Sequence, residues 1–514
     1  MVLSKTGMWL AAALGLSAAV VAGFVMFTSG KAGGVNLTSA SLVPADAGVY
    51  VAFNTDLKSP QWVAAFDLIE RLGEDDPEGQ LRESAEDDGD LDWEEDVQPF
   101  LGGNAAVYVN SFDAMSFEVR GAVIAKVKDG DRVLEVIEEE GHFDLHEESF
   151  METTFFSTDN GQVWVAIIDG HLVMAMSEAS MLDVIEVAKG EKKSLAGDAD
   201  FVALRDELET DFIGFVYVNM DQMLTEMAGG EALSEALDEA GADLALAPMA
   251  GVIGAKKDGF VFQAAGGGDP GIAAAMLEPR ISRYATMVPA DTAVFVSTYG
   301  LADAFDEMLD EAGDELDEAL GANSPWPSVG DLLDELGEEA GVGSLQEVIG
   351  LFDGETAVAI WFPDGSEESA EGALMTEVAN VADARDVIDR LVDEPETVFE
   401  EVNGVPFWTN GEGDAIALSG SDLFIGTEDA VRRLLAGAGE ALEESDQYRR
   451  TVATLPTSTG TFGFVDMSSV LRLAAGGIPA ELDEAEQALD AFIINWVTER
   501  GLARVNGALT VQPE

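Results

Sequence analysis

Hydrophobic and polar positions along this chain follow two periods, one of two residues and one of about 3.6 residues. Apolar or alternating runs predict the strands of the first half, at 49–53, 105–109, 121–127, 155–156, 163–168, 172–176, 212–220, 252–255 and 260–263. Apolar residues at helical spacing, such as Trp62, Phe66 and Ile69, predict amphipathic helices. These helices span 60–72, 132–140, 180–188 and 201–208.

The same pattern of segments occurs a second time. The run Leu42-Val-Pro-Ala-Asp46 precedes one β-prone stretch, and Met287-Val-Pro-Ala-Asp291 precedes another. Later segments match in the same order: 100–109 with 351–360, 121–124 with 372–375, 172–174 with 423–425, and 217–220 with 464–467. Because the order is kept over more than two hundred residues, we interpret the chain as an internal duplication.

Turn residues join these segments into hairpins. Asn160-Gly161 and Asp169-Gly170 separate apolar runs in the first half, and Asn410-Gly411 does so in the second. Such dipeptides favour tight turns between antiparallel strands. Strands and hairpins interrupted by helices predict the α+β class: two tandem copies of a mostly antiparallel sheet with helices packed on it, after one N-terminal transmembrane helix.

The domain boundaries follow from composition. We expect a cytoplasmic tip and membrane anchor at 1–28, a flexible tether at 29–41, a first repeat at 42–268, a linker at 269–286 and a second repeat at 287–514. Within the linker we expect a helix from about 272 to 284. The acidic stretch 74–96 has few apolar residues, so we expect a solvated loop there.

Residues 8–28 are uncharged and long enough to cross about 30 Å of hydrocarbon as a helix. Lys5 precedes this segment, which favours a cytoplasmic N-terminus and an extracytoplasmic body. A cleaved signal peptide is the alternative, with 29–34 as a weak cleavage site. We therefore expect a single-pass membrane protein, and whether the segment is cleaved stays open.

Three short motifs resemble a known family. They are Leu42-Val-Pro-Ala-Asp46, the strand Val49-Tyr-Val51, and Pro99-Phe-Leu-Gly-Gly103 before a second strand. In this order they are similar to the domain-of-unknown-function family numbered 3352. The resemblance implies a bacterial or archaeal envelope protein, often with one N-terminal anchor. It brings no established activity and no catalytic residues.

The charge balance narrows the possible partners. The chain has 99 acidic and 26 basic residues, a formal charge of -73. Nucleic acid and anionic membrane surfaces are poor partners because like charges repel, whereas cations and basic proteins fit this charge. Dense carboxylates also keep a protein hydrated in concentrated salt, so adaptation to a saline medium is an equally good explanation. The chain has no cysteine, which excludes disulfides and thiolate chemistry.

Candidate metal ligands are few. His142 and His146 have helical i, i+4 spacing, but Phe143 stands where a zinc protease has glutamate, and the local sequence is typical of a loop or strand. His171 is the only other histidine. The alternating Asp88, Asp90 and Asp92 resemble part of a calcium loop that lacks its glycine and its final glutamate. We assign no metal ligand, no cofactor and no catalytic residue.

Other catalytic signatures are absent from the sequence. We find no Gly-x-Ser-x-Gly elbow, no phosphate-binding loop and no dinucleotide fingerprint. Trp164, Phe407, Trp408 and Phe464 lie in apolar runs, where core packing is their ordinary role. We expect a non-enzymatic binding or scaffold module of the cell envelope. A carrier of an apolar ligand and a carboxylate-dependent hydrolase are the alternatives.

If the acidity reflects a saline medium, the melting temperature of the chain will rise as KCl is raised from low to molar concentration. The physical reason is that salt screens repulsion among the excess carboxylates. Thermal unfolding followed by circular dichroism measures this shift. An unchanged melting temperature would remove the saline explanation.

Overall fold

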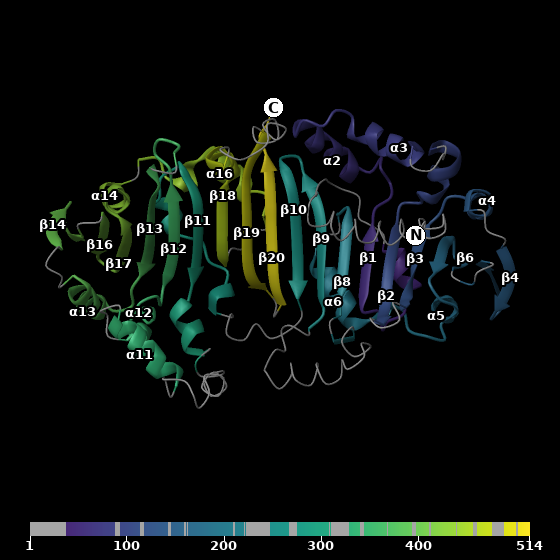
Figure 1. The fold of residues 1–514 in the computed structure, drawn as a ribbon, viewed down its shortest axis with the longest axis horizontal. Helices are drawn as coiled ribbons and strands as arrows, with labels where there is room; N and C mark the ends of the chain where they lie inside the picture. Colours follow the sequence, from purple (N-terminus) through teal and green to yellow (C-terminus); the bar gives the residue numbers. More distant parts are fainter. Residues whose placement is uncertain are drawn as a thin grey trace, which may run out of the picture. The chain divides into compact units, whose positions relative to one another are not determined.

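In a computed structural model the chain divides into two compact units, Met1–Asp269 and Pro270–Glu514. Each unit is described by itself (Figure 1). The described residues are 37–87, 93–113, 118–141, 145–158, 161, 163–208, 211–219, 221–222, 247–266, 275–307, 309, 328–339, 344–366, 369–392, 397–410, 413–437, 439–455, 460–474, 488–499 and 502–513.

The strands of the first unit pair side by side in the order β4–β5–β6–β7–β3–β2–β1–β8–β9–β10, and every pairing is antiparallel. The first strand in the chain therefore lies inside the sheet, between β2 and β8. The bounds are β1 (Val49–Phe53), β2 (Ala105–Asp113), β3 (Glu118–Lys126), β4 (Leu145–Phe150), β5 (Thr153–Thr158), β6 (Trp164–Ile168), β7 (His171–Ala175), β8 (Gly214–Val218), β9 (Met249–Lys256) and β10 (Gly259–Gly266).

The strands of the second unit pair in the corresponding order, β14–β15–β16–β17–β13–β12–β11–β18–β19–β20, again antiparallel throughout. Their bounds are β11 (Thr292–Tyr299), β12 (Glu355–Trp361), β13 (Glu371–Glu377), β14 (Val398–Val402), β15 (Val405–Thr409), β16 (Asp414–Ser419), β17 (Asp422–Thr427), β18 (Thr461–Asp466), β19 (Leu489–Glu499) and β20 (Leu502–Val511). The mixed helix and antiparallel-sheet class expected from the sequence is confirmed.

Helices connect these strands. In the first unit they are α2 (Pro60–Arg71), α3 (Pro77–Asp87), α4 (Gly130–Gly141), α5 (Glu178–Ala188) and α6 (Ala199–Glu207), with short turns η1 (Thr38–Ser41), η2 (Trp93–Val97), η3 (Gln98–Phe100) and η4 (Leu195–Gly197). In the second they are α11 (Val329–Glu339), α12 (Leu345–Ile349), α13 (Val381–Leu391), α14 (Glu428–Ala436), α15 (Asp446–Val452) and α16 (Met467–Ala474), with η6 (Ala275–Leu277), η7 (Tyr284–Thr286) and η9 (Leu442–Glu444).

One face of each sheet, called the inner face, holds buried aromatic side chains. In the first unit Tyr50 pairs with Tyr108 on β2 and with Tyr217 on β8. Phe201 of α6 packs against this row, with ring centroids 5.9 Å from Tyr50 and 5.3 Å from Tyr217. Burial of such large side chains is a main source of folding free energy.

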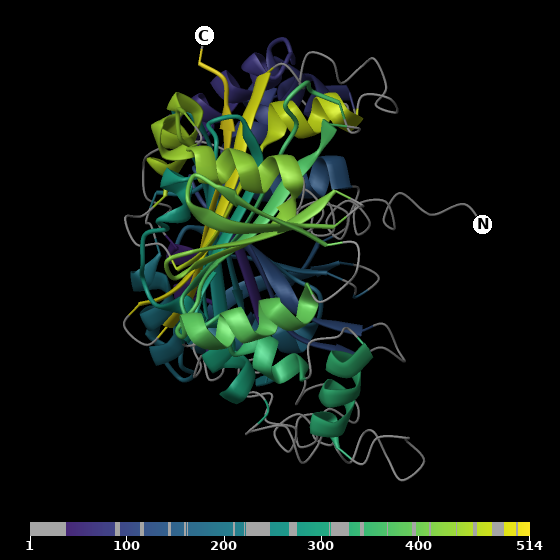
Figure 2. The same cartoon turned by 90° about the vertical axis from the view of Figure 1, so that its left-hand side faces the viewer.

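The opposite, outer face is covered by a helix at one end of the sheet. In the second unit α13 packs on Leu418 and Leu423 on this face. Helix α14 lies on the inner face of the same strands, and Figure 2 shows the two helices on either side of them. In the first unit α4 packs on Val165 and Leu172 in the corresponding place.

Two expectations about local structure are wrong. The stretch 74–96 contains helix α3, because it is rich in helix-forming residues and Arg82 forms an ion pair with Glu78 one turn earlier. The expected helix at 272–284 is replaced by the short turns η6 and η7. Pro279 lacks a backbone N–H and restricts the residue before it, which ends helical geometry.

The apolar segment 8–28 and its tether residues up to 36 lie outside the described residues. Within the described part of the chain, no helix combines the length and the low polarity that a membrane crossing requires. The sequence left 141–147 open between a loop and a strand, and the hairpin that β4 forms with β5 was not predicted. Their two-residue turn, Met151–Glu152, has left-handed backbone angles without Asn or Gly, so the sequence lacks the usual turn signal.

Candidate functional site

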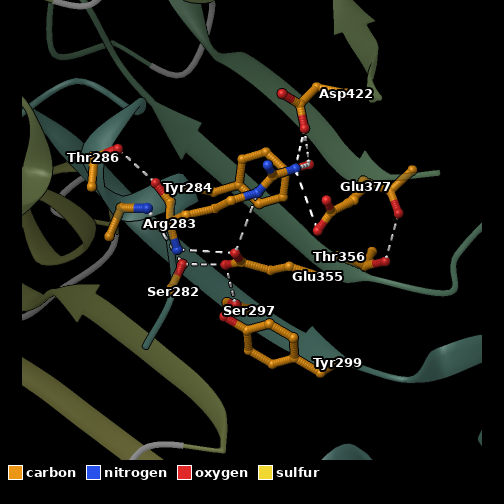
Figure 3. Close-up of polar contacts among 12 residues, drawn as sticks. Ser282, Arg283, Tyr284, Thr286, Ser297, Tyr299, Glu355, Thr356, Glu377 and Asp422 are labelled. Carbon is orange, nitrogen blue, oxygen red and sulfur yellow. Dashed lines mark hydrogen bonds and ion pairs between the residues drawn. The ribbon is translucent and has the colours of Figure 1, made fainter. Parts of the chain in front are cut away.

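A group of polar side chains fastens the segment that enters the second unit (Figure 3). We call it the Arg283 cluster: Ser282, Arg283, Tyr284, Ser297, Tyr299, Glu355, Glu377 and Asp422. Ser282 to Tyr284 precede β11, and the three carboxylates stand at the ends of β12, β13 and β17. The sheet register brings them together, since Glu355 pairs with Tyr299 and Glu377 pairs with Asp422.

Glu355 is the buried centre of this cluster, with 1% of its surface exposed. Its carboxylate accepts hydrogen bonds from the Ser282 hydroxyl, from the Arg283 backbone N–H at 2.9 Å and from the Ser297 hydroxyl at 2.8 Å. A buried carboxylate is expensive to desolvate unless donors surround it, and here all the named partners are donors. Glu355 therefore ties the entering segment to two strands.

Arg283 supplies the positive charge of the cluster. Its guanidinium forms an ion pair with Asp422 and lies 3.7 Å from the Glu377 carboxylate. It also stacks over the Tyr284 ring, 4.9 Å from the centroid. The Tyr284 hydroxyl donates to Asp422 at 3.0 Å. Burial, followed by the Asp422 charge, raises the pKa of Tyr284, so this hydroxyl stays a donor at ordinary pH.

The first unit has a polar group at the equivalent place. Lys126 pairs with His171 across β3 and β7, as Glu377 pairs with Asp422 across β13 and β17. Asn104 directly precedes β2, where Glu355 begins β12. The strand positions that carry two acids in the second unit therefore carry two bases in the first.

The contacts of this first-unit group also hold the entering segment. The Thr38 hydroxyl lies 3.1 Å from Nε2 of His171, and the Ser39 hydroxyl donates to Asn104 at 2.7 Å. Ser39 also lies 2.7 Å from the Tyr50 hydroxyl. Both groups fasten the turn before the first strand of their unit, one through a charged network and one through mainly neutral hydrogen bonds. In both units, hydrogen bonds join the entering turn to the sheet. Such contacts are those of a structural clamp.

His171 is the buried member of the first-unit group, with 4% of its surface exposed. Burial, and after it the charge of Lys126, lowers the pKa of His171. A neutral imidazole that accepts from Thr38 fits this environment, because protonation would place two cations side by side.

Of the residues considered from the sequence as metal ligands, the structure describes only His146 and His171, which lie on different strands. His142 and the aspartates at 88, 90 and 92 lie outside the described residues. His146 is exposed on strand β4, which confirms the strand interpretation of that region, and His171 is on β7. Over the described ranges, no three His, Asp or Glu side chains are arranged to hold a metal ion.

The aromatic side chains considered for ligand stacking lie in the sheets. Phe407 and Phe464 are fully buried. Trp164 and Trp408 are partly buried, and Trp408 packs against Phe399 with ring centroids 5.6 Å apart. These contacts are those of core and cross-strand packing.

The Arg283 cluster was missed by motif analysis. Arg283 and Asp422 lie 139 residues apart in the sequence, and no member belongs to a catalytic motif. The available signal was the difference between the repeats at matched positions. Lys126 and His171 in one copy stand where Glu377 and Asp422 stand in the other.

The sequence matches a known protein family. The family model described as "Protein of unknown function (DUF3352)" matches residues 9–492. The chain belongs to this family. The resemblance seen in the short sequence motifs is thereby confirmed. No curated protein matches the chain.

The chain has only low similarity to solved structures. Crystal form I of TP0453 is 11% identical with a TM-score of 0.24, covering 44% of this chain and 77% of that one. Crystal form III is 12% identical with a TM-score of 0.25, covering 46% and 80%. At this level of likeness these structures support no inference about the present chain.

Replacing Glu355 by Gln will lower the free energy of unfolding of the second unit by about 1–3 kcal/mol, because an amide nitrogen cannot accept all the buried hydrogen bonds. Urea unfolding followed by tryptophan fluorescence measures the change. Glu278→Gln is the matched control, since the Glu278 side chain is 61% exposed and forms an ion pair with Arg280. Equal effects of the two variants would contradict the central role of Glu355.

The first unit will lose stability as the pH falls below about 6.5, the ordinary pKa of histidine. Because the folded-state pKa of His171 is lowered, the unfolded chain binds more protons in this range, and the loss is complete once the pH passes below the folded-state value. Urea unfolding at several pH values should show a smaller acid-induced loss in His171→Gln than in the native chain. His146→Gln, at an exposed site, should keep the native slope.

Proposed function

We propose that this chain is a membrane-tethered, extracytoplasmic binding protein of the cell envelope and that it is not an enzyme. The uncharged segment 8–28, preceded by Lys5, supports the tether and its orientation. The shared strand order of the two units, together with the repeated motifs, supports descent from one duplicated α+β unit.

The observation that carries the binding role is the apolar outer face of each unit. On β1 and β2 this face presents the paired valines Val49 with Val109 and Val51 with Val107, all partly exposed. In a chain with 24% charged residues, a row of strand positions without charge indicates a surface for an apolar partner.

The second unit repeats this surface. Val296 on β11 pairs with Val358 on β12, and they are 42% and 39% exposed. Ile494 and Trp496 on β19 lie on the same face and are partly buried. These residues also carry no charge.

An apolar-ligand carrier is the second candidate, and the threonines of this face favour it. The hydroxyls of Thr298 and Thr461 lie 2.8 Å apart, and those of Thr356 and Thr376 lie 2.9 Å apart. These four hydroxyls are therefore already engaged in hydrogen bonds, and Thr461 also donates to the Met276 carbonyl at 3.0 Å. A ligand without hydrogen-bonding groups along its length, such as an acyl chain, matches that chemistry.

Binding of a fluorescent fatty acid distinguishes the surface from a purely structural face. We expect Val296→Asp and Val358→Asp to reduce binding by about tenfold, since each introduces an unpaired charge on the apolar face. Val63→Asp is the control for the added charge, because Val63 is exposed on helix α2 of the first unit and is not a strand residue. No binding by the native chain, or equal binding by all three variants, would count against an apolar surface.

The extracytoplasmic position of the body of the chain is tested in a separate experiment. In cells without an outer barrier, external protease should digest the body of the chain while a cytoplasmic marker stays intact. A protected body would overturn the extracytoplasmic assignment and leave the fatty-acid result unaffected.

A further inference from the structure

The edge strand β14 of the second unit is exposed. Of the strands that the structure describes, only β15 pairs with it. Val398 and Phe399 are 60% and 59% exposed, a high value for neighbouring apolar residues on a strand. An exposed apolar edge strand is a template for pairing with another extended chain.

The hairpin geometry shows which backbone groups face outward. Asn403 and Gly404 form a two-residue turn with left-handed φ values of 55° and 82°, so Val402 and Val405 close the hairpin. Hydrogen-bonded and non-hydrogen-bonded pairs alternate from that closing pair. The pairs of Glu401 with Pro406 and of Phe399 with Trp408 are therefore the non-hydrogen-bonded ones.

Two observations agree with this register. Pro406, opposite Glu401, has no backbone N–H and suits a position without a ladder bond to β14. The rings of Phe399 and Trp408 lie 5.6 Å apart, which fits the close side chains of a non-hydrogen-bonded pair. The N–H and C=O groups of Phe399 and Glu401 consequently point to the free edge.

The equivalent strand of the first unit, β4, is protected against pairing with another strand. Its hairpin closes at Phe150 with Thr153, so Glu147 occupies the position that Phe399 has in β14. His146, Glu147 and Glu148 are exposed there. Charged residues on an edge strand discourage pairing, and β14 has lost this protection at the matching place.

Side-chain contacts with helix α14 also fix the position of β14. Arg432 of α14 forms an ion pair with Glu400 of β14 and another with Glu428 at 2.7 Å. The same guanidinium lies over the Phe407 ring of β15, 4.5 Å from its centroid. These contacts reduce the ordering cost when a further strand is added.

Charge indicates the kind of partner. Strand β14 carries two carboxylates, Glu400 and Glu401, and no basic residue. A second copy of this chain would bring the same charges to the edge, within a total of -73 per chain. A basic segment is attracted by the same field.

We propose that β14 binds an extended, basic segment of another protein, which adds to the sheet as a strand through the outward N–H and C=O groups of Phe399 and Glu401. Alternate apolar side chains of that segment pack on Phe399, and its lysines or arginines face the surrounding carboxylates. This inference does not depend on the apolar outer faces.

The probe is a seven-residue peptide of alternating lysine and valine or phenylalanine, with a fluorescent label. Amide hydrogen exchange should slow by about tenfold or more at Phe399 and Glu401, which face outward, and stay unchanged at Glu400. The same peptide with alternate backbone nitrogens methylated should not bind, because it keeps the charge and loses the ladder. Equal binding of both peptides would overturn strand addition in favour of simple charge attraction.

Two variants locate the site. Glu401→Pro removes an outward N–H and leaves the β14–β15 ladder intact, so the peptide affinity should fall by about tenfold. Phe399→Ser removes the apolar contact of β14 without changing its charge, so the peptide affinity should again fall by about tenfold. The matched control is Ser149→Pro, at the corresponding position of β4. Thermal melting confirms that each variant is folded.

Three outcomes would overturn the proposal: no binding by the native chain, unchanged affinity in both β14 variants, or equal loss in Ser149→Pro. Sedimentation of the native chain without peptide tests the second-copy alternative. Concentration-dependent dimers that Phe399→Ser dissolves would replace the basic partner with self-pairing. Loss of fatty-acid binding in Val296→Asp with peptide binding retained would show that the two surfaces act separately.

Discussion

The structure depends on the register between the first strand of each unit and its two neighbours. Because side chains alternate between the faces of a strand, one register decides every contact on both faces. In the first unit this register places Tyr50 between Tyr108 and Tyr217 on the inner face and valines on the outer face. Asn104, directly before β2, accepts a hydrogen bond from Ser39 in the turn that precedes β1, where the polar clamp forms.

The two repeats keep this frame and differ in chemistry at matched positions. One clamp places acids around Arg283, and the other uses Thr38 beside the basic Lys126 and His171. Hydrogen bonds to the entering turn are present in both units, so the attachment is kept while the charges beside it differ. The free edges differ in the same manner: β4 carries exposed charged residues, whereas β14 exposes Val398 and Phe399. The two units share their strand pairing and differ at the strand ends and at the free edge. At these positions one unit can acquire an interaction that the other lacks.

Sequence analysis succeeded where a strong period coincided with a turn or cap. The helix expected at 60–72 is α2, whose start is capped by the Ser59 side chain. It failed where the local signal was absent. Helix α3 has few apolar residues, and the Met151–Glu152 turn has neither Asn nor Gly. The helix expected across Pro279 shows that apolar spacing cannot outweigh a missing backbone donor.

By itself the sequence determined the internal repeat, the α+β class, the family resemblance and the strong negative charge, because each is a property of local pattern or composition. The tertiary structure alone decided the clamps and the open edge. Ser282 and Glu355 are 73 residues apart, and Arg283 and Asp422 are 139 apart. Such pairs meet only after the strand order is set, and that order is a cooperative outcome of long-range packing that no local period encodes.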